Sequence, residues 1–293
     1  MGCNASKNNK ESIIINSNKW DYLEDLGKGT FGTVIKVKCD NYSYNSDSIF
    51  GALKIFKKKS KNYVYENISS ESYHKKVIYR EIDILSELNH NNIIKVYGSL
   101  ETSNNIFLLM EYVRGKTLYD YIKTFNVTEE ENKIFTRDLC NTIDYIHKSG
   151  SIYIDLKPEN IIIKNGQLSN GFKLIDFGSI EKIQNITSGN YRIITKGYCS
   201  PEIYYKNIVT EENDIWSIGV ISFILHHKYM PYSSKLYRRD IPYSKWPKIK
   251  YRGCSENAKD LWQNMLNVNM RHRYRIMDIN NHPWMNDDKV IIK

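Results

Sequence analysis

Four polar residues from two short stretches of the chain form a set that could do chemistry. Asp155, Lys157 and Asn160 stand in Tyr-Ile-Asp-Leu-Lys-Pro-Glu-Asn, and Asp176 opens an Asp-Phe-Gly further on. Such groups suit a hydrophobic core poorly, because a buried charge needs a partner or a metal. They suit a polyphosphate well, since Asp155 can accept a hydroxyl proton and Lys157 can neutralise phosphate charge. The oxygens of Asn160 and Asp176 can ligate Mg²⁺. The alternative is a solvated polar loop followed by a strand that happens to end in Asp-Phe-Gly.

A glycine-rich stretch near the start gives a second candidate phosphate contact, with the pattern Gly-x-Gly-x-x-Gly-x-Val. It consists of Gly27, Lys28, Gly29, Gly32 and Val34 with their intervening residues. The spacing alone is weak, because it also marks dinucleotide folds, where it opens a helix. Here residues 33–38 alternate and are rich in Val and Ile, which predicts a strand. We therefore expect a strand–loop–strand hairpin whose backbone N–H groups lie over phosphates.

One cation and one acid stand among apolar residues downstream of this loop. Residues 52–56, Ala-Leu-Lys-Ile-Phe, predict a strand carrying Lys54, and residues 77–88 have the apolar spacing of a helix. Glu81 falls on the same side of that helix as Leu85. An acid on an inward face needs a counter-charge, and Lys54 is the obvious one. The alternative is that both side chains face solvent.

Together these motifs resemble those of the eukaryotic protein kinases. The resemblance covers roughly residues 20 to 288 and includes Asp-x-Trp-Ser-x-Gly at 214–219 and His-Pro-Trp at 282–284. It implies an α+β, bilobal protein kinase fold over residues 19–288. The small β-rich N-terminal lobe, with one main helix, would span 19–112, and the larger α-helical C-terminal lobe would span 113–288. Residues 1–18 are expected to form a disordered tail.

The resemblance assigns roles at the phosphates and the metal. Asp155 would be the catalytic base. Lys54, held by Glu81, would pair with the α- and β-phosphates of ATP. Asn160 and Asp176 would hold Mg²⁺. ATP and Mg²⁺ are therefore the expected cofactors.

For the adenine, the resemblance implies a pocket whose back is guarded by Met110. Backbone groups of Glu111 and Val113 would hydrogen-bond the adenine edge. The full set of expected ATP-binding residues is Gly27, Lys28, Gly29, Gly32, Val34, Ala52, Lys54, Met110, Glu111, Val113 and Ile162.

The neighbourhood of Lys157 resembles serine/threonine kinases rather than tyrosine kinases, which usually carry Arg or Ala there. The hydroxyl of Thr195 could bridge Asp155 and Lys157. The segment from Thr195 to Glu202 resembles one that docks peptide substrates, and Glu202 is expected to be buried against Arg273. The implied activity is transfer of the ATP γ-phosphate to Ser and Thr hydroxyls of proteins.

The catalytic loop departs from the family pattern, because Tyr-Ile-Asp replaces the usual His-Arg-Asp. Tyr153 is still a ring that can pack under Phe177, in a column with Leu85 and Val96. Ile154 stands in place of the arginine that grips a phosphorylated activation loop. Its absence puts regulation in doubt rather than chemistry, so we expect activity without phosphorylation of that loop.

Other elements follow from local patterns. Thr128 with Glu131 forms a capping box that begins a helix. Residues 92–97 and 106–111 predict two strands of the first lobe, and the basic segment 57–76 predicts an insertion or mobile connection.

The first residues fit an N-myristoylation pattern, with Gly2 after Met1 and Ser6 four positions on. One acyl chain gives only marginal membrane binding, so a second chain on Cys3 and nearby lysines would supply the second signal. We expect the protein at the cytoplasmic face of a membrane, the plasma membrane in particular, or in the cytoplasm. The alternative is a chance pattern in a disordered tail.

The composition limits which other classes of protein this chain could belong to. The chain has 293 residues, 41% of them hydrophobic, and a formal net charge of +9. No apolar run approaches the length of a membrane span, and no secretory signal is recognisable. Five scattered cysteines argue for a reducing compartment and against a disulfide framework or a zinc site. No nucleic-acid-binding motif accompanies the basic charge, and we expect a monomer without nucleic-acid partners.

Two rival functions remain at this point. A catalytically inactive kinase fold acting as a membrane scaffold should have lost Lys54, Asp155 or Asp176, and all three are present. A kinase of small molecules would not need the segment from Thr195 to Glu202 with its partner Arg273.

Overall fold

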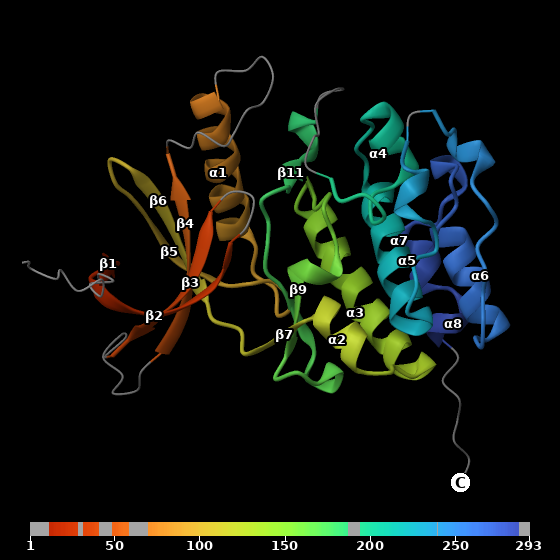
Figure 1. Ribbon diagram of the computed structural model, residues 1–293, viewed down its shortest axis with the longest axis horizontal. Coiled ribbons are helices and arrows are strands. Elements are labelled where there is room, and N and C mark those ends of the chain that lie inside the picture. Colours follow the sequence, from red (N-terminus) through yellow and green to blue (C-terminus); the bar gives the residue numbers. More distant parts are fainter. Residues whose placement is uncertain are drawn as a thin grey trace, which may run out of the picture. The chain divides into compact units, whose positions relative to one another are not determined.

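The computed structural model describes residues 12–28, 32–40, 49–58, 70–186, 194–238 and 240–286. The chain divides into two compact units. The first comprises Met1–Glu87 with Ile94–Val113, and the second comprises Leu88–Ile93 with Arg114–Lys293. Figure 1 labels the elements of each unit.

The first unit is a six-stranded antiparallel sheet with one long helix, α1 (Ser70–Glu87). The strand order is β1-β2-β3-β4-β6-β5. A buried cluster that includes Trp20, Val37, Leu53 and Leu109 packs on the sheet. The strands are β1 (Ile13–Ile15), β2 (Asn18–Lys28), β3 (Thr33–Cys39), β4 (Ile49–Lys57), β5 (Val96–Glu101) and β6 (Asn105–Glu111).

Strand β1 corrects the expected tail, which was placed over residues 1–18. Asn16 and Ser17, both with positive φ, turn the chain so that β1 pairs with β2. Positive φ at both central positions is typical of a two-residue hairpin turn. Ile15 is 2% exposed and joins the cluster around Trp20. The prediction of disorder is therefore wrong for residues 12–18, because burial of Ile15 fixes this segment to the sheet.

Two further boundaries differ from the prediction. Helix α1 begins at Ser70, so the last part of the expected 57–76 insertion is helical, while residues 59–69 lie outside the described ones. Strand β5 begins at Val96 rather than residue 92. The reason is that Ile93 forms an isolated bridge with Leu174 and belongs to the second unit.

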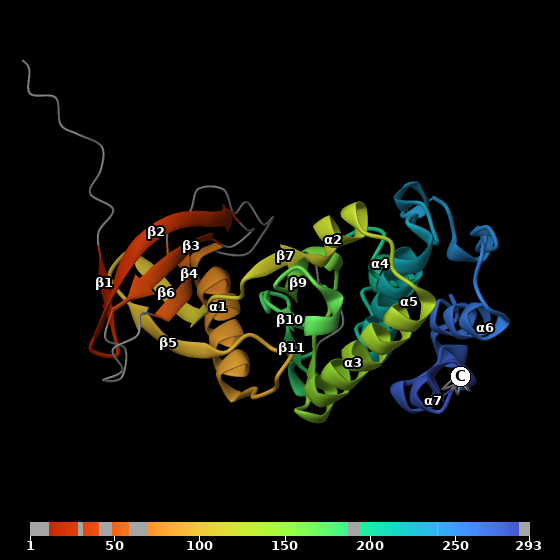
Figure 2. The same ribbon diagram turned by 90° about the horizontal axis from the view of Figure 1, so that it is seen from below.

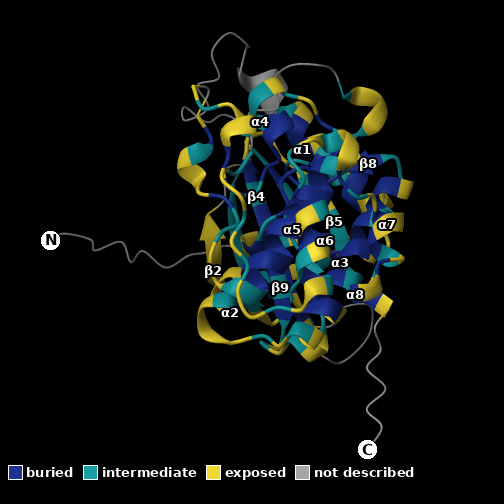
Figure 3. Ribbon diagram, turned by 90° about the vertical axis from the view of Figure 1, so that its right-hand side faces the viewer, coloured by how far each residue is buried: buried dark blue, intermediate teal, exposed yellow. Residues whose placement is uncertain are grey.

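The second unit is mainly helical and is organised around α5 (Glu211–His227). Every residue from 213 to 225 is buried, which is the pattern of a central helix rather than a surface one. Helices α3 (Glu129–Lys148) and α6 (Glu256–Met265) pack on it, as Figure 2 shows. Figure 3 shows the dark blue of α5 among the more exposed elements around it. The shorter helices are α2 (Leu118–Thr124), α4 (Pro201–Lys206), α7 (Ile276–Asn280) and α8 (Pro283–Asn286).

Two small sheets carry the loops of this unit. One has the order β10-β9-β7, with β7 (Gly115–Thr117), β9 (Ile161–Lys164) and β10 (Phe172–Leu174). The other pairs β8 (Ser151–Ile152) with β11 (Glu181–Lys182). Together they hold the stretch that contains the four polar residues singled out above.

The predicted capping box at Thr128 is confirmed. The Thr128 N–H donates to Glu131 Oε2 at 2.8 Å, and the Glu131 N–H donates to Thr128 Oγ1 at 3.2 Å. No helix in the described part of the chain is long and apolar enough to cross a membrane.

Candidate active site

In the first unit, Lys54 on β4 and Glu81 on α1 form the predicted ion pair. Lys54 Nζ lies 2.6 Å from Glu81 Oε1, and the two residues are 6% and 1% exposed. A pair so deeply buried loses solvation on folding, so its stabilising effect is small or absent. The pair is better explained by the fixed position it gives the lysine ammonium.

The glycine-rich loop is described at its two ends. Strands β2 and β3 pair up to Lys28 opposite Thr33, with a register shift between Asp25 and Gly27. The prediction of strand–loop–strand is confirmed by this pairing. Gly29 and the two residues after it lie outside the described part.

Gly32 has a packing reason to be glycine. A Cβ on this residue would lie 2.2 Å from the carbonyl oxygen of Ile55 on β4. No side chain fits in that gap, so the backbone of the loop can approach β4 only with glycine at this position. Gly27, in contrast, has open space around its Cβ position.

The residues predicted to meet adenine fall in both units. Ala52 and Met110 are paired neighbours on β4 and β6, and both are buried. The N–H of Glu111 donates to the Lys95 carbonyl at 2.9 Å, so this donor is already used in the first unit. Ile162 lies on β9 of the second unit, opposite Lys173. Their contact with a nucleotide stays a prediction.

In the second unit, Asp155, Lys157 and Thr195 form a closed triangle of hydrogen bonds. Lys157 Nζ donates to Asp155 Oδ2 at 2.5 Å and to Thr195 Oγ1 at 2.9 Å. Thr195 donates to Asp155 Oδ1 from its hydroxyl at 2.8 Å and from its backbone N–H at 3.0 Å. The predicted bridge by the Thr195 hydroxyl is confirmed. The triangle places a carboxylate and an ammonium side by side on one loop.

Asn160 and Asp176 are brought together by the pairing of β9 with β10. Leu174 pairs with Ile161, and the next residue, Ile175, donates its N–H to the Asn160 carbonyl at 3.0 Å. The side-chain amide of Asn160 donates to the Asp155 carbonyl at 3.0 Å, which ties it to the catalytic loop.

These two side chains fit a magnesium ion. The Asn160 nitrogen is engaged as a donor, and Asp176 Oδ1 accepts from the Gly178 N–H at 3.2 Å. In the described part of the chain no three His, Cys, Asp or Glu side chains gather as a metal site. An amide oxygen and a carboxylate with substrate phosphates are nevertheless a usual Mg²⁺ environment, since the ion keeps few protein ligands.

Asp214, at the start of α5, fixes the catalytic loop. Its carboxylate accepts the backbone N–H groups of Tyr153 and Ile154, both at 2.9 Å. Ile154 has φ of 75°, a left-handed conformation that is strained for a β-branched residue. The sequence identified Asp214 only as part of a structural motif, and these two hydrogen bonds show that it holds the turn that carries Asp155.

His147, near the end of α3, completes this arrangement and was missed from the sequence. Its Nε2 lies 2.8 Å from Asp214 Oδ2. Burial disfavours the charged ring, but the hydrogen bond and charge of Asp214, with the charges of Glu211 and Asp144, raise the pKa of His147 above its ordinary value. The sequence feature that could have indicated this role is the position of His147, about one helical turn before a polar loop.

One predicted supporting contact is present, together with a hydrogen bond that was not predicted. The rings of Tyr153 and Phe177 meet edge to face, with centroids 5.1 Å apart, while Leu85 and Val96 belong to the first unit. Tyr153 Oη donates to the Asp176 carbonyl at 2.5 Å.

The expected pair of Glu202 and Arg273 is confirmed as a bidentate contact. Arg273 Nη1 and Nη2 lie 2.6 and 3.0 Å from the two carboxylate oxygens of Glu202. Asn213 also donates to Glu202 at 2.7 Å. Nearby, burial raises the pKa of the Cys199 thiol to about 12, with Asp155 adding to the effect, so this thiol stays protonated.

Comparisons with known proteins agree with this geometry. Residues 20–285 match the family model described as protein kinase domain. "Myosin light chain kinase 2, skeletal/cardiac muscle" of Rattus norvegicus is 29% identical over 273 residues, which are 90% of this chain and 42% of the relative. "Maternal embryonic leucine zipper kinase" of Xenopus laevis is 31% identical over 275 residues, 91% of this chain and 39% of the relative. The chain thus spans less than half the length of these relatives. By the match over residues 20–285 and the geometry above, the chain belongs to the protein kinase family.

Proposed function

We propose that this protein is a serine/threonine protein kinase, which transfers the γ-phosphate of ATP to Ser and Thr hydroxyls of proteins. The observation that carries the proposal is the triangle of Asp155, Lys157 and Thr195. It supplies an acceptor for a hydroxyl proton next to a cation, on a loop that Asp214 fixes.

Each residue then has a distinct task. Asp155 orients the substrate hydroxyl and accepts its proton, and Lys157 stabilises negative charge on the phosphoryl oxygens. Asn160 and Asp176 would hold Mg²⁺. ATP would supply the phosphoryl group, and the bound Mg²⁺ would offset the negative charge of the phosphate oxygens. Catalysis of this kind consists mostly of positioning and electrostatic stabilisation, so a preformed arrangement matters more than any covalent step.

The test is a peptide array that presents Ser, Thr and Tyr in otherwise random sequences, incubated with labelled ATP and Mg²⁺. We expect label on Ser and Thr peptides. Asp176→Asn serves as the inactive control, because it removes a proposed metal ligand. Label on Tyr peptides alone would contradict the Ser/Thr assignment, and no label at all with correctly folded protein would contradict the activity.

We also propose that Gly2 is myristoylated and Cys3 palmitoylated, provided that Met1 is the initiator, and that the protein acts as a monomer at the cytoplasmic face of a membrane. The support is the sequence pattern, since residues 1–11 lie outside the described part. Labelling of cells with an alkyne analogue of myristate should mark the wild-type protein and leave Gly2→Ala unmarked. Equal labelling of both would contradict the proposal.

A further inference from the structure

One stretch of the second unit carries most of the net positive charge of the chain. From Lys228 to Arg252 the sequence has eight lysine or arginine residues and one acid, Asp240, while the formal net charge of the whole chain is +9. Among the described residues of this stretch, Lys235 and Lys245 are exposed. A surface with an excess of one sign attracts ligands of the opposite sign. Solvated lysines alone could account for the excess, so the position of these cations decides what it means.

The stretch is held in place by buried aromatic rings. Tyr237 and Trp246 are 1% and 9% exposed, and their ring centroids lie 4.9 Å apart. Two tyrosines of α4 reach the same segment. The Tyr204 hydroxyl donates to the Tyr237 carbonyl at 2.6 Å, and the Tyr205 hydroxyl donates to the Leu236 carbonyl at 2.8 Å. The cations of the stretch therefore have a defined position next to α4.

Tyrosine rings also join α4 to the segment that follows the candidate active site. Lys196 Nζ lies 5.5 Å from the ring centroid of Tyr204, and Lys206 Nζ, at the end of α4, lies 5.7 Å from that of Tyr243. The ring of Tyr205 lies 5.0 Å from that of Tyr204 and 6.0 Å from that of Tyr243. Lys196 and Lys206 thus belong to one surface, linked by three tyrosine rings.

The ammonium groups of this surface are available to a ligand. In the described part of the chain, the one ion pair of the 228–252 stretch joins Arg238 to Asp240, at 2.6 Å. A tyrosine face attracts an ammonium group but leaves N–H donors for an oxygen ligand. Two short 3₁₀ helices, Ser234–Leu236 and Tyr243–Lys245, carry further lysines. Four exposed lysines on the segments that the tyrosines join form no ion pair with a described residue, and we call them the cationic surface: Lys196, Lys206, Lys235 and Lys245.

We propose that the cationic surface selects protein substrates that carry Asp or Glu residues within a few positions of the phosphorylated Ser or Thr. The inference rests on the proposed function, because that function places the substrate hydroxyl at Asp155. Thr195, which donates to Asp155 at 2.8 Å, is followed directly by Lys196. A substrate whose hydroxyl meets Asp155 therefore has its neighbouring residues close to the first of these cations.

The position of the cationic surface favours a substrate over a lipid bilayer as its ligand. A bilayer that covered Lys196 would also cover the neighbouring carboxylate of Asp155, which must accept the substrate proton. A peptide can contact both at once, since five residues of extended chain reach roughly 17 Å. Carboxylates of the peptide supply the charge that complements the lysines.

The first test compares three peptides with the same single Ser, flanked on each side by two Glu, two Gln or two Lys residues. Wild type should phosphorylate the Glu peptide with kcat/KM about tenfold or more above that of the Lys peptide, and the Gln peptide should fall between, because several exposed charge pairs act together. Lys206→Glu with Lys235→Glu should reduce or reverse this order. Equal kcat/KM for the three peptides would overturn the inference and leave the proposed function intact.

The second test measures binding without phosphotransfer. A fluorescein-labelled Glu peptide with Ala in place of Ser is titrated with the full chain, and fluorescence polarisation reports binding. Lys206→Glu with Lys235→Glu should weaken binding about tenfold or more. Binding that depends on these two lysines, with no transfer to any of the three Ser peptides, would support the acidic ligand and contradict the proposed function instead.

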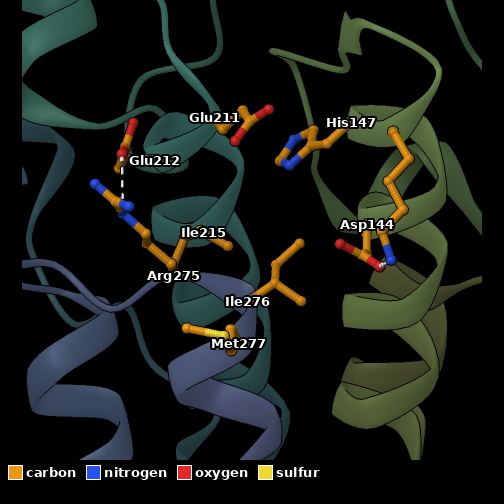
Figure 4. A pocket seen from close by; sticks show the side chains of 9 residues that line it. Asp144, His147, Glu211, Glu212, Ile215, Arg275, Ile276 and Met277 are labelled. Carbon is orange, nitrogen blue, oxygen red and sulfur yellow. Dashed lines mark ion pairs between the residues drawn. The ribbon is translucent and has the colours of Figure 1, made fainter.

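The matched control reverses two exposed cations elsewhere in the second unit, Lys148 and Arg275. They line the pocket between α3, α5 and α7 that Figure 4 shows, and their side chains are 75% and 79% exposed. Lys148→Glu with Arg275→Glu makes the same change in net charge and should leave binding and peptide preference unchanged. Thermal melts should show all variants folded. Equal weakening in the control would mean that net charge alone attracts the peptide, which would overturn the proposal.

A lipid ligand is tested with vesicles of phosphatidylserine and phosphatidylcholine, in a Gly2→Ala background that removes the proposed acyl chain. Lys206→Glu with Lys235→Glu should not change sedimentation with these vesicles. Loss of vesicle binding in that variant, with peptide binding unchanged, would make a lipid surface the ligand and overturn the proposal.

Discussion

Two ion pairs of the second unit have similar lengths and different surroundings. Lys157 and Asp155 are joined at 2.5 Å, and Arg273 and Glu202 at 2.6 Å. The Arg273 side chain is fully buried and also donates to the carbonyls of Asn267 and Glu212. The Lys157 side chain is 21% exposed, and among the described residues its ammonium donates hydrogen bonds only to Asp155 and Thr195.

The difference separates an ion pair suited to a structural role from one that, in the proposed function, takes part in phosphotransfer. A guanidinium with every direction engaged by backbone and carboxylate oxygens has no capacity left for a substrate. The Lys157–Asp155 pair is partly exposed and lies on a loop held by Asp214, so it can contact a substrate. The predictions that follow test whether this separation holds.

The Glu202–Arg273 pair should show the largest effect on stability. Glu202→Gln or Arg273→Met leaves one buried charge without its partner, which should cost about 3–5 kcal/mol in the free energy of unfolding. The double variant should cost less than the sum of the two, as neighbouring groups that interact do not add. Urea denaturation of the four proteins checks this, and strict additivity would contradict the assigned structural role.

We expect the Lys54–Glu81 pair of the first unit to affect catalysis more than stability. Lys54→Met should lower kcat/KM about 10²–10³-fold, because a positioned cation is lost from the phosphates. Glu81→Gln should cost less, since it keeps the lysine. Steady-state assays below the melting temperature measure kcat/KM for both variants. A loss under about tenfold for Lys54→Met would indicate that the pair has a structural role, like Glu202–Arg273.

Two histidines of the second unit should have opposite pH dependence. Burial against Phe223, with the nearby charge of His226, lowers the pKa of His227 to about 4, although a hydrogen bond to the Phe223 carbonyl acts the other way. The unfolded chain then binds a proton near pH 6.5 that the folded chain does not, so His227 should reduce stability as pH falls from about 6.5 to about 4.

His227→Phe keeps a ring that can stack on Phe223. In thermal melts it should reduce the fall in melting temperature between about pH 6.5 and about pH 4. His147, with a raised pKa, should instead contribute stability below its unfolded pKa and lose it as pH rises through the folded value. If the melting temperature of His227→Phe falls as steeply at acid pH as that of wild type, other groups cause the loss of stability.

The smallest effect is expected in the activation loop. Because Ile154 replaces an arginine, changing Thr187, Ser188 and Tyr191 to Ala, Ala and Phe should leave turnover largely intact. These three residues lie outside the described part of the chain. A loss of about a hundredfold would indicate that a phosphate on this loop is needed despite the missing arginine.

Much of the site could be predicted from sequence, by two routes. A charge in apolar surroundings has few possible partners, which pointed to Lys54 with Glu81, whereas the contacts of Thr195 and Glu202 were expected from the kinase resemblance. Lys54 with Glu81, Thr195 with Asp155, and Glu202 with Arg273 were each predicted and are each observed. The order of the motifs also gave the fold class correctly, as the family match shows.

Other features were not readable from local pattern. Residues 13–15 are three isoleucines between polar stretches, and only their packing near Trp20 makes them a strand. The first turns of α1 read Ser-Glu-Ser-Tyr-His-Lys-Lys and have no apolar period. The bonds from Asp214 to the catalytic loop join residues about 60 positions apart, which no local spacing reveals.

The most direct measurement compares Asp155→Asn with wild type in two quantities, the single-turnover rate of phosphotransfer from Mg²⁺-bound ATP and the free energy of unfolding. The account predicts a rate about 10³-fold lower, because the proton acceptor is lost, with nucleotide binding retained. A variant that transfers phosphate at the wild-type rate, or a folded wild type that binds ATP and Mg²⁺ and transfers nothing, would contradict it.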